Sequence, residues 1–404
     1  MQYSSKKDFI ILLGNAIDHF DTSIYLFLAP IIAPLFFPHS DPVIALIMAY
    51  GILVTSIVAR PVGTYIFGMI TSNSGPSKAL SYSLIGVGIA TLAVSVLPDY
   101  HTIGIAAPIL LIIFKIFREV FAAGESAIAK LYILQDKPEK EAFKSSYLYQ
   151  TSTIFGIILA SVTSTFVHYL DIANSWRIVF FLGGFAAIIG YILRKNSVVV
   201  PKKHSKEPLK FYGHGGIKIL WNHKADLLRI AIVNSFSHLT YVIPFVTMNH
   251  LIPLITNIEL KTMMAINSFM LVFDMVAIPS IGRIINRFDP AYIMIISSIT
   301  LALTIIPIWY FIAGASLAYI TFVRFWIVIW GIVFLCPLNL WCNNQIKGNK
   351  KYIVVGMGTT LGASVIGKLT PSICLALYYA TETYMSVAIY IAIMFVVVTF
   401  TIKN

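Results

Sequence analysis

Long apolar segments separated by short polar stretches recur along the whole chain. About twelve of them reach the ~20 residues that an α-helix needs to cross a bilayer. They are continuous apolar runs without the two-residue alternation of barrel strands, so the pattern predicts transmembrane helices. The first six are expected at about 9–37, 43–70, 79–97, 103–134, 144–168 and 176–195, and the second six at about 227–256, 262–286, 290–312, 316–341, 352–380 and 383–402.

Composition supports this pattern. The chain has 404 residues, of which 58% are hydrophobic and 11% charged, and its mean hydropathy is +0.83. Soluble domains carry about 25% charged residues, so the composition indicates an all-α integral membrane protein. The net charge of +12 does not indicate nucleic-acid binding, because the charges fall mainly between apolar segments and on one side of the predicted membrane.

Lysine and arginine gather in alternate connections between the predicted spans, which by the positive-inside rule makes both termini and the central loop cytoplasmic. The first segment is interrupted by acids and no small-residue cleavage site follows it, so we interpret it as a retained span rather than a signal peptide. The opposite connections, at 38–42, 98–102, 168–175 and 381–383, lack lysine, and only the one after the seventh span has one. The basic connections contain Lys6, Lys7, Lys78, Lys137, Lys140, Lys144, Arg283, Arg287, Lys347, Lys350, Lys351, Lys403 and the stretch 194–229.

A basic stretch at 196–226 separates an N-terminal six-helix lobe, 1–195, from a C-terminal one, 227–404. We interpret it as a solvated cytoplasmic linker, the alternative being that 210–224 docks on anionic lipid. The segments 68–78 and 282–290 occupy the same place in each lobe, between its second and third helices. Two parallel halves with weak internal similarity are typical of a transporter whose site lies at the midplane between them.

The first segment carries the strongest functional signal. Asp18 and Asp21 are three residues apart, on one helical face, and Tyr25 continues that face. An aspartate at a helix centre costs ~3 kcal/mol, which the surrounding Ile, Leu and Phe residues offset at ~0.3–0.6 kcal/mol each. Because lipid cannot solvate such a stripe, it predicts one wall of a polar cavity within the membrane.

The fourth segment carries Lys115, Arg118 and Glu125 at a spacing that places them on one face, and Glu119 lies four residues after Lys115, close enough to neutralise it. Two interpretations are open. The charges form an internal ion-pair network between helices, or the cations bind an anionic substrate while Asp18, Asp21 or Glu125 exchanges a coupling proton.

Other polar residues inside apolar segments allow alternatives. Arg60 either pairs with Asp18 or Asp21 or contacts substrate. Lys368 either protrudes into the cavity or packs at an interface, and snorkelling accounts for Arg177. The remaining ones in the second half are Asp274, Arg324 and two histidines that are hydrogen-bonded or relay protons, His238 and His250.

Motifs for other chemistry are missing from the sequence. Cys336, Cys342 and Cys374 have no metal-ligand spacing and are expected to pack as small apolar residues. A phosphate-binding loop is absent, and glycines such as Gly88 and Gly362 instead predict close helix contacts. We therefore expect no cofactor, no metal and no enzyme activity.

Several motifs resemble the major facilitator superfamily, and within it the metabolite:proton symporters for proline/betaine, 2-oxoglutarate, citrate and shikimate. The opening GNAIDHFDTSIYLFLAPIIAPLFFP is similar to the first helix of that family. ARPVG at 59–63, Gly124-Glu125 and SWRI at 175–178 resemble its second, fourth and sixth helices, with Lys115 where arginine is usual. The resemblance implies a two-lobed, monomeric transporter that works by alternating access.

The resemblance also assigns gating roles to Gly68, Gly75 and Arg287, in the loops that latch the cytoplasmic gate. The first of these loops lacks the acid and arginines of the family signature, and Asn286 replaces the acid in the second. We expect proton-coupled uptake of a small anionic or zwitterionic metabolite across a bacterial inner membrane. The alternatives are an exporter of a drug or siderophore-like compound on the same fold, and a non-transporting sensor or scaffold.

Overall fold

The computed structural model describes residues 2–38, 48–49, 51–52, 55–169, 174–196 and 214–403. Among the predicted outer connections, residues 39–42 of the one at 38–42 and residues 170–173 of the one at 168–175 fall outside these residues. Most of the basic linker does too, with Lys202, Lys203, Lys206 and Lys210.

The chain divides into two compact units. The first consists of Met1–Ile133 and Ser152–Ile219, and the second of Leu134–Thr151 and Leu220–Asn404. The first turns of the helix that begins at Glu139 therefore pack with the second unit, although the sequence pattern groups them with the N-terminal lobe. The predicted lobe boundaries, 1–195 and 227–404, stay a prediction.

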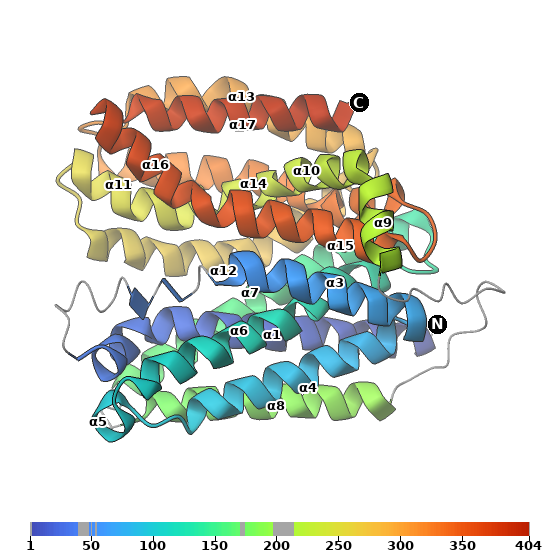
Figure 1. The fold of residues 1–404 in the computed structure, drawn as a ribbon. Helices are drawn as coiled ribbons and strands as arrows, with labels where there is room; N and C mark the ends of the chain where they lie inside the picture. Colours follow the sequence, from blue (N-terminus) through green and yellow to red (C-terminus); the bar gives the residue numbers. More distant parts are fainter. Residues whose placement is uncertain are drawn as a thin grey trace. The chain divides into compact units, whose positions relative to one another are not determined.

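The first unit is built from long helices (Figure 1). Its longest, α1, runs over Gln2–Phe36, and α4 packs against both α6 and α8. The other elements are α3 (Ser56–Ser74), α4 (Pro76–Ser95), α5 (Tyr100–Ile103), α6 (Ala106–Tyr132) and α8 (Trp176–Asn196), with α7 (Glu139–Tyr169) from Ser152 onward and α9 (His214–Asn222) up to Ile219.

The second unit repeats this helical construction, with two π-helical turns inserted into its long helices. Its elements are α10 (Lys224–Val242), η1 (Ile243–Thr247), α11 (Met248–Ile255), α12 (Leu260–Ile285), α13 (Pro290–Tyr310), α14 (Leu317–Gln345), α15 (Lys351–Leu361), η2 (Gly362–Gly367), α16 (Lys368–Thr381) and α17 (Met385–Lys403).

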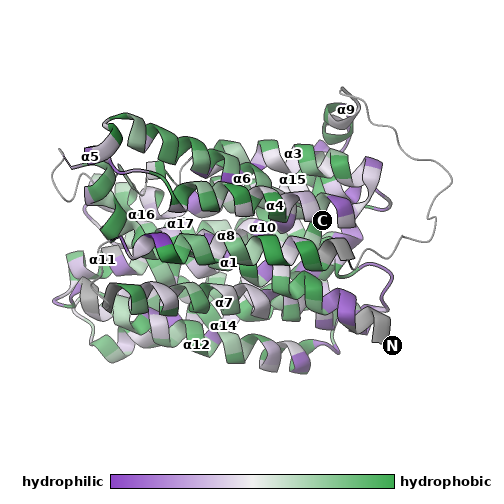
Figure 2. Ribbon diagram, turned by 90° about the horizontal axis from the view of Figure 1, so that it is seen from below, coloured by the Kyte–Doolittle hydropathy of each residue, from purple (hydrophilic) through white to green (hydrophobic). Residues whose placement is uncertain are grey.

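Among the described residues, nine helical segments are long and apolar enough to cross a membrane. The other predicted spans correspond to α1, α3 and α6, of 35, 19 and 27 residues, which carry the charged residues described below. Figure 2 shows apolar residues along most of the length of helices such as α4, α8 and α12, with hydrophilic residues mainly toward helix ends. The prediction of an all-α membrane protein is confirmed.

Local sequence accounts for several helix ends. Gly75 adopts a φ of 88° between α3 and α4, and Pro76 then supplies the fixed φ that suits a first helical turn. The side chain of Asp289 accepts a hydrogen bond from the backbone N–H of Tyr292 and caps α13. In the connection after α4, the Thr102 hydroxyl donates to Asp99 and lowers the pKa of that carboxyl.

Arg177 stabilises the end of α4 in the first unit. Its Nη1 donates to the carbonyl oxygens of Ser95 and Leu97, at 3.1 and 2.6 Å, and its guanidinium lies over the Trp176 ring. The terminal carbonyls of a helix lack intrahelical partners, so a cation placed there satisfies them. Arg177 therefore does more than extend its charged group toward the membrane surface, which is the role that the sequence suggested.

Glycines let the helices of the first unit approach closely. A Cβ at Gly63 of α3 would lie 2.1 Å from the carbonyl oxygen of Val120 in α6, and one at Gly156 of α7 would lie 2.2 Å from that of Ala16 in α1. Gly88 of α4 faces the backbone of Gly184 in α8 in the same way. Close backbone approach is the main source of helix packing in lipid, where the hydrophobic effect between helices is small.

The second unit has an aromatic core and close contacts at the predicted glycines. The ring centroid of Phe236 lies 4.1 Å from that of Phe334 and 4.7 Å from that of Phe395. A Cβ at Gly362, in the π-helical turn η2, would lie 2.4 Å from the carbonyl oxygen of Ala231 in α10. The predicted glycine contacts are therefore present in both units.

Candidate functional site

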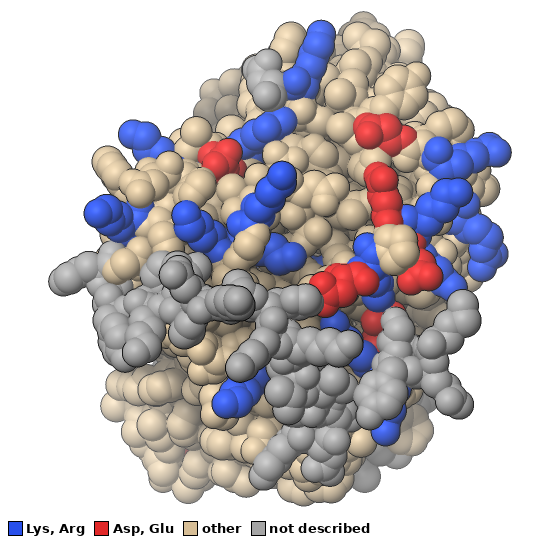
Figure 3. Space-filling view, turned by 90° about the vertical axis from the view of Figure 1, so that its right-hand side faces the viewer, with Lys and Arg blue, Asp and Glu red and all other residues tan. Residues whose placement is uncertain are grey.

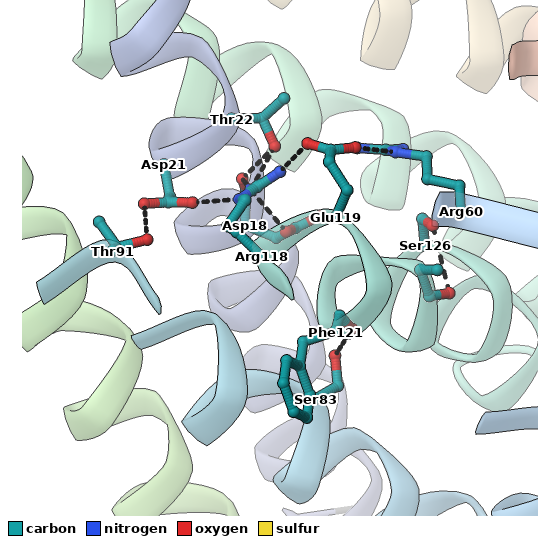
Figure 4. Close-up of polar contacts among 11 residues, drawn as sticks. Asp18, Asp21, Thr22, Arg60, Ser83, Thr91, Arg118, Glu119, Phe121 and Ser126 are labelled. Atoms are coloured by element: carbon teal, nitrogen blue, oxygen red, sulfur yellow. Dashed lines mark hydrogen bonds and ion pairs between the residues drawn. The ribbon is translucent and has the colours of Figure 1, made fainter. Parts of the chain in front are cut away.

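Arg118, on α6, is the centre of a buried charged network in the first unit (Figure 4). Its Nε donates to Asp21 Oδ2 at 2.5 Å, its Nη1 to Glu119 Oε1 at 2.8 Å and its Nη2 to Asp18 Oδ1 at 3.1 Å. Arg118 is 1% exposed, so these ion pairs form without competition from water. Arg118 can serve three carboxylates because its five donors point in fixed, different directions.

The two aspartates of α1 have different surroundings. Asp21 also accepts a hydrogen bond from the Thr91 hydroxyl of α4, at 2.6 Å, so both of its oxygens are engaged. Asp18 has the longer contact with Arg118, and it experiences the like charges of Glu125 and Asp21. Both acids therefore face protein, as the polar stripe of the first helix predicts.

Glu119 joins the second and fourth predicted spans. Its Oε2 accepts a 2.6 Å hydrogen bond from Nε of Arg60, on α3, while Oε1 is bound by Arg118. Of the two alternatives for Arg60, pairing with Asp18 or Asp21 is wrong in its partner, because the ion pair forms with this third acid, and contact with substrate stays a prediction. The expected neutralisation of Lys115 by Glu119 is also wrong, because Glu119 turns toward the two arginines.

Lys115 is 3% exposed and lies over the face of the Tyr25 ring, with Nζ 4.2 Å from the ring centroid. Among the residues that the structure describes, it has no ion-pair partner. The Tyr25 hydroxyl donates to the carbonyl oxygen of Ala49, which holds the ring in this position. The first unit thus contains a buried ammonium group that a cation–π contact stabilises only in part.

Close packing positions these side chains. The Gly63 contact presses α3 against α6 beside Arg60, and a Cβ at Gly124 would meet the Phe67 ring at 2.7 Å, next to Glu125. Glu125 itself is fully buried. Lys115 and Arg118 contact side chains of α1, and Glu125 interacts electrostatically with Asp18, so these three residues share the neighbourhood of α1, as their helical spacing indicates.

Two participants were not found from the sequence. Arg118 Nη2 donates to the Thr22 hydroxyl at 2.5 Å, and Thr91 donates to Asp21. Thr22 follows Asp18 by four residues, so helical periodicity could have included it. Thr91 lies in an apolar stretch of α4, and threonine is common in such helices because its hydroxyl can bond its own backbone.

The candidate residues of the second half lie in the second unit. Lys368, the first residue of α16, is exposed. Arg324 is fully buried and donates to the carbonyl oxygens of Pro244 and Met263 and to the side chains of Asn249 and Asn267. The π-helical turn leaves the Pro244 carbonyl available for this contact.

The gating candidates have separate local roles. Gly68 accepts a hydrogen bond from the Ser72 hydroxyl within α3, and Gly75 forms the tight turn that follows. Arg287 lies over the Phe288 ring, and Asn286 Nδ2 donates to the carbonyl oxygen of Lys140 at 3.4 Å. Their participation in a gate stays a prediction.

The two histidines of the seventh predicted span differ in what can be said of them. The His250 side chain lies outside the described residues, and His238 packs against Gly367.

Comparison with solved structures decides the fold. The proton:xylose symporter XylE, bound to 6-bromo-6-deoxy-D-glucose, matches 99% of this chain and 95% of its own with a TM-score of 0.75 and 13% sequence identity. The human organic anion transporter MFSD10 (TETRAN) matches 99% of both chains with a TM-score of 0.73 and 13% identity. This chain has the major facilitator fold.

Sequence comparison places the likeness to known transporters in the first half of this chain. The family model described as Sugar (and other) transporter matches residues 10–199. The proline/betaine transporter of Escherichia coli K12 is 34% identical over 188 residues, 45% of this chain and 37% of that relative. The alpha-ketoglutarate permease of the same organism is 26% identical over 222 residues, 54% of this chain and 51% of the permease.

These matches confirm the resemblance to major facilitator metabolite transporters that the first, second, fourth and sixth helices indicate. The named proteins are transporters or permeases, in agreement with the prediction that this chain is not an enzyme. The matched regions span about half of the curated relatives or less.

Proposed function

We propose that this protein is a secondary transporter that takes up a small anionic or zwitterionic organic metabolite together with protons, by alternating access. The observation that carries the proposal is Lys115, a buried ammonium group with no carboxylate partner among the described residues. Burying a cation without a counter-ion is costly, and a substrate carboxylate would remove that cost. The proline/betaine and alpha-ketoglutarate relatives are named for substrates that carry a carboxylate.

Charge balance supports coupling to a proton. The set around Arg118 contains four carboxylates, Asp18, Asp21, Glu119 and Glu125, and three cations, Arg60, Arg118 and Lys115. With all of these groups ionised its net charge is −1, so a substrate anion makes the site more negative and a bound proton offsets that added charge. Asp21 accepts hydrogen bonds on both oxygens, so we assign the proton to Asp18, with Glu125 as its neighbour.

The distribution of charge supports a proposal for membrane location and orientation. We propose a bacterial inner-membrane protein, monomeric, with both termini and the basic linker in the cytoplasm. Figure 3 shows far more lysine and arginine than aspartate and glutamate on the face that it draws. Concentration of cationic side chains outside the apolar segments on one side is typical of cytoplasmic loops.

The test is uptake into proteoliposomes under an imposed proton gradient, with a panel of labelled organic acids, betaines and amino acids. We expect Lys115→Met to raise the half-saturation concentration by at least about tenfold, since a lost charged hydrogen bond costs about 1.5–3 kcal/mol. Lys115→Arg keeps the cation and is expected to retain transport, and Lys350→Met, at an exposed position, serves as the matched control.

Two results would overturn the proposal. If only neutral or cationic compounds accumulate, the assigned substrate class is wrong. If nothing accumulates and inverted vesicles show efflux, the exporter becomes the better interpretation.

A further inference from the structure

The second unit contains a buried acid of a different kind from those in the first. Asp274, in the middle of α12, is 5% exposed, and its Oδ1 is buried without a hydrogen-bond partner. Among the described residues it forms no ion pair, whereas Asp18, Asp21 and Glu119 all bind arginine. A carboxyl group in this position is either neutral or bound to a ligand that the chain itself does not provide.

The groups packed around Asp274 do not neutralise it. The buried cation of the same unit, Arg324, donates to four oxygens of η1, α11 and α12, and none of them belongs to Asp274. Cys336 of α14 points to the Ile278 carbonyl oxygen, one helical turn further along α12, at 3.7 Å. Among the described residues, Tyr241 of α10 is a titratable group that interacts electrostatically with Asp274, and its phenol is uncharged at neutral pH.

The surroundings favour a proton over a metal cation. Hard cations take several oxygen ligands, and no group of three or more acidic, histidine or cysteine side chains that could hold a metal is found in the described chain. Pro279 has no N–H, so the carbonyl oxygen of Met275 lacks its helical hydrogen bond, but this oxygen and the Asp274 carboxylate provide fewer ligands than a hard cation takes. A proton needs one carboxylate oxygen, and Asp274 has one that is unbound.

We propose that Asp274 is a second proton-binding site, in the C-terminal unit, which loads and releases a proton during the transport cycle. Ionisable residues within transmembrane helices are costly and are found along proton pathways for that reason. The proposal rests on the proposed proton-coupled transport but on none of the residues of the Arg118 network. With Asp18 in the first unit and Asp274 in the second, each unit binds one exchangeable proton.

The first experiment needs neither a substrate nor a variant. Dicyclohexylcarbodiimide adds to protonated buried carboxyl groups and forms a stable acylurea, which mass spectrometry detects. The tryptic peptide 262–283 contains Asp274 as its only acidic side chain, and the peptide 288–324 contains only the exposed Asp289, which serves as the internal control. Labelling is measured on the full chain in liposomes.

We expect peptide 262–283 to carry at least about tenfold more label than peptide 288–324 at neutral pH, because water-exposed carboxylates are deprotonated there. Labelling should fall as the pH is raised. Equal labelling of the two peptides would overturn the proposal, as would labelling that is the same in acidic and alkaline buffer, which describes a permanently protonated residue. If Na⁺ protects Asp274 from the carbodiimide, the proposal is also overturned, and Asp274 is then part of a sodium site.

The second experiment measures the ratio of protons to substrate in proteoliposomes, with a pH-sensitive dye and a substrate from the uptake panel. We expect Asp274→Asn to lower this ratio by one proton, Asp274→Glu to keep it, and Asp289→Asn to match the wild type. An unchanged ratio in Asp274→Asn would sink the inference while leaving the proposed function intact. Wild-type uptake without proton movement would instead refute the proposed function, whatever the labelling shows.

Discussion

At the residue scale, the most consequential side chain is Arg118. A buried cation that serves three carboxylates cannot be replaced without leaving several charges unpaired in a medium that does not solvate them. Arg118 therefore has a structural role in addition to any role in transport. The same reasoning separates it from Lys115, whose loss would remove an unpaired charge rather than create one.

We expect Arg118→Leu to lower the free energy of unfolding by about 3–5 kcal/mol, because it leaves Asp18, Asp21 and Glu119 without their shared cation. Thermal unfolding of the purified protein in detergent would measure this as a lower Tm. Adding Asp21→Asn should recover part of the loss, since the two changes are coupled. Arg287→Leu, at an exposed position, is the control, and an Arg118→Leu variant as stable as this control would contradict the prediction.

At the element scale, α6 is the helix on which the site is assembled. Its charged residues face α1 and α3, and its small residues Ala122, Ala123 and Gly124 are buried against neighbouring helices. Because glycine contacts set the distance between α3 and α6, they also set the position of Arg60 relative to Glu119. Packing and the ion-pair network are therefore linked along one pair of helices.

We expect Gly63→Ala to move α3 away from α6, since its Cβ would lie 2.1 Å from the Val120 carbonyl oxygen. Overpacking of this kind costs about 1–3 kcal/mol, which should appear as a lower Tm and as weaker proton-coupled uptake. Gly51→Ala is the matched control, because nothing lies within 4 Å of its Cβ position. If both variants behave alike, the Gly63 contact does not hold the helices together.

At the scale of the whole molecule, the charge distribution predicts one orientation in the membrane. The native cysteines Cys336, Cys342 and Cys374 are buried, so they give little background for labelling with a membrane-impermeant thiol reagent. Cysteines introduced at Lys350 and Glu382, both exposed, report opposite ends of the second unit. In intact cells we expect Glu382→Cys to react and Lys350→Cys to react only after permeabilisation. The reverse pattern would place the termini outside.

Much of this protein follows from its sequence. The apolar runs place most of the helices to within a few residues, because transfer of a helix into lipid depends on the residues of that helix alone. The second span is an exception, since it was predicted at 43–70 and α3 runs over Ser56–Ser74. The spacing of Asp18, Asp21 and Tyr25, and of Lys115, Arg118 and Glu125, also assigns these residues to inward faces, because helical periodicity is local.

Only the tertiary structure decided which charges meet. Arg118 lies 97 positions from Asp21, and Arg60 lies 59 positions from Glu119, so the rotation and separation of packed helices determine these pairs. That is why the suggested pairing of Arg60 with α1 and the suggested neutralisation of Lys115 by Glu119 were wrong, while contact of Arg60 with substrate stays a prediction. Lys115 and Asp274 stand out for the same reason, since a missing partner can be recognised only when the surrounding helices are in place.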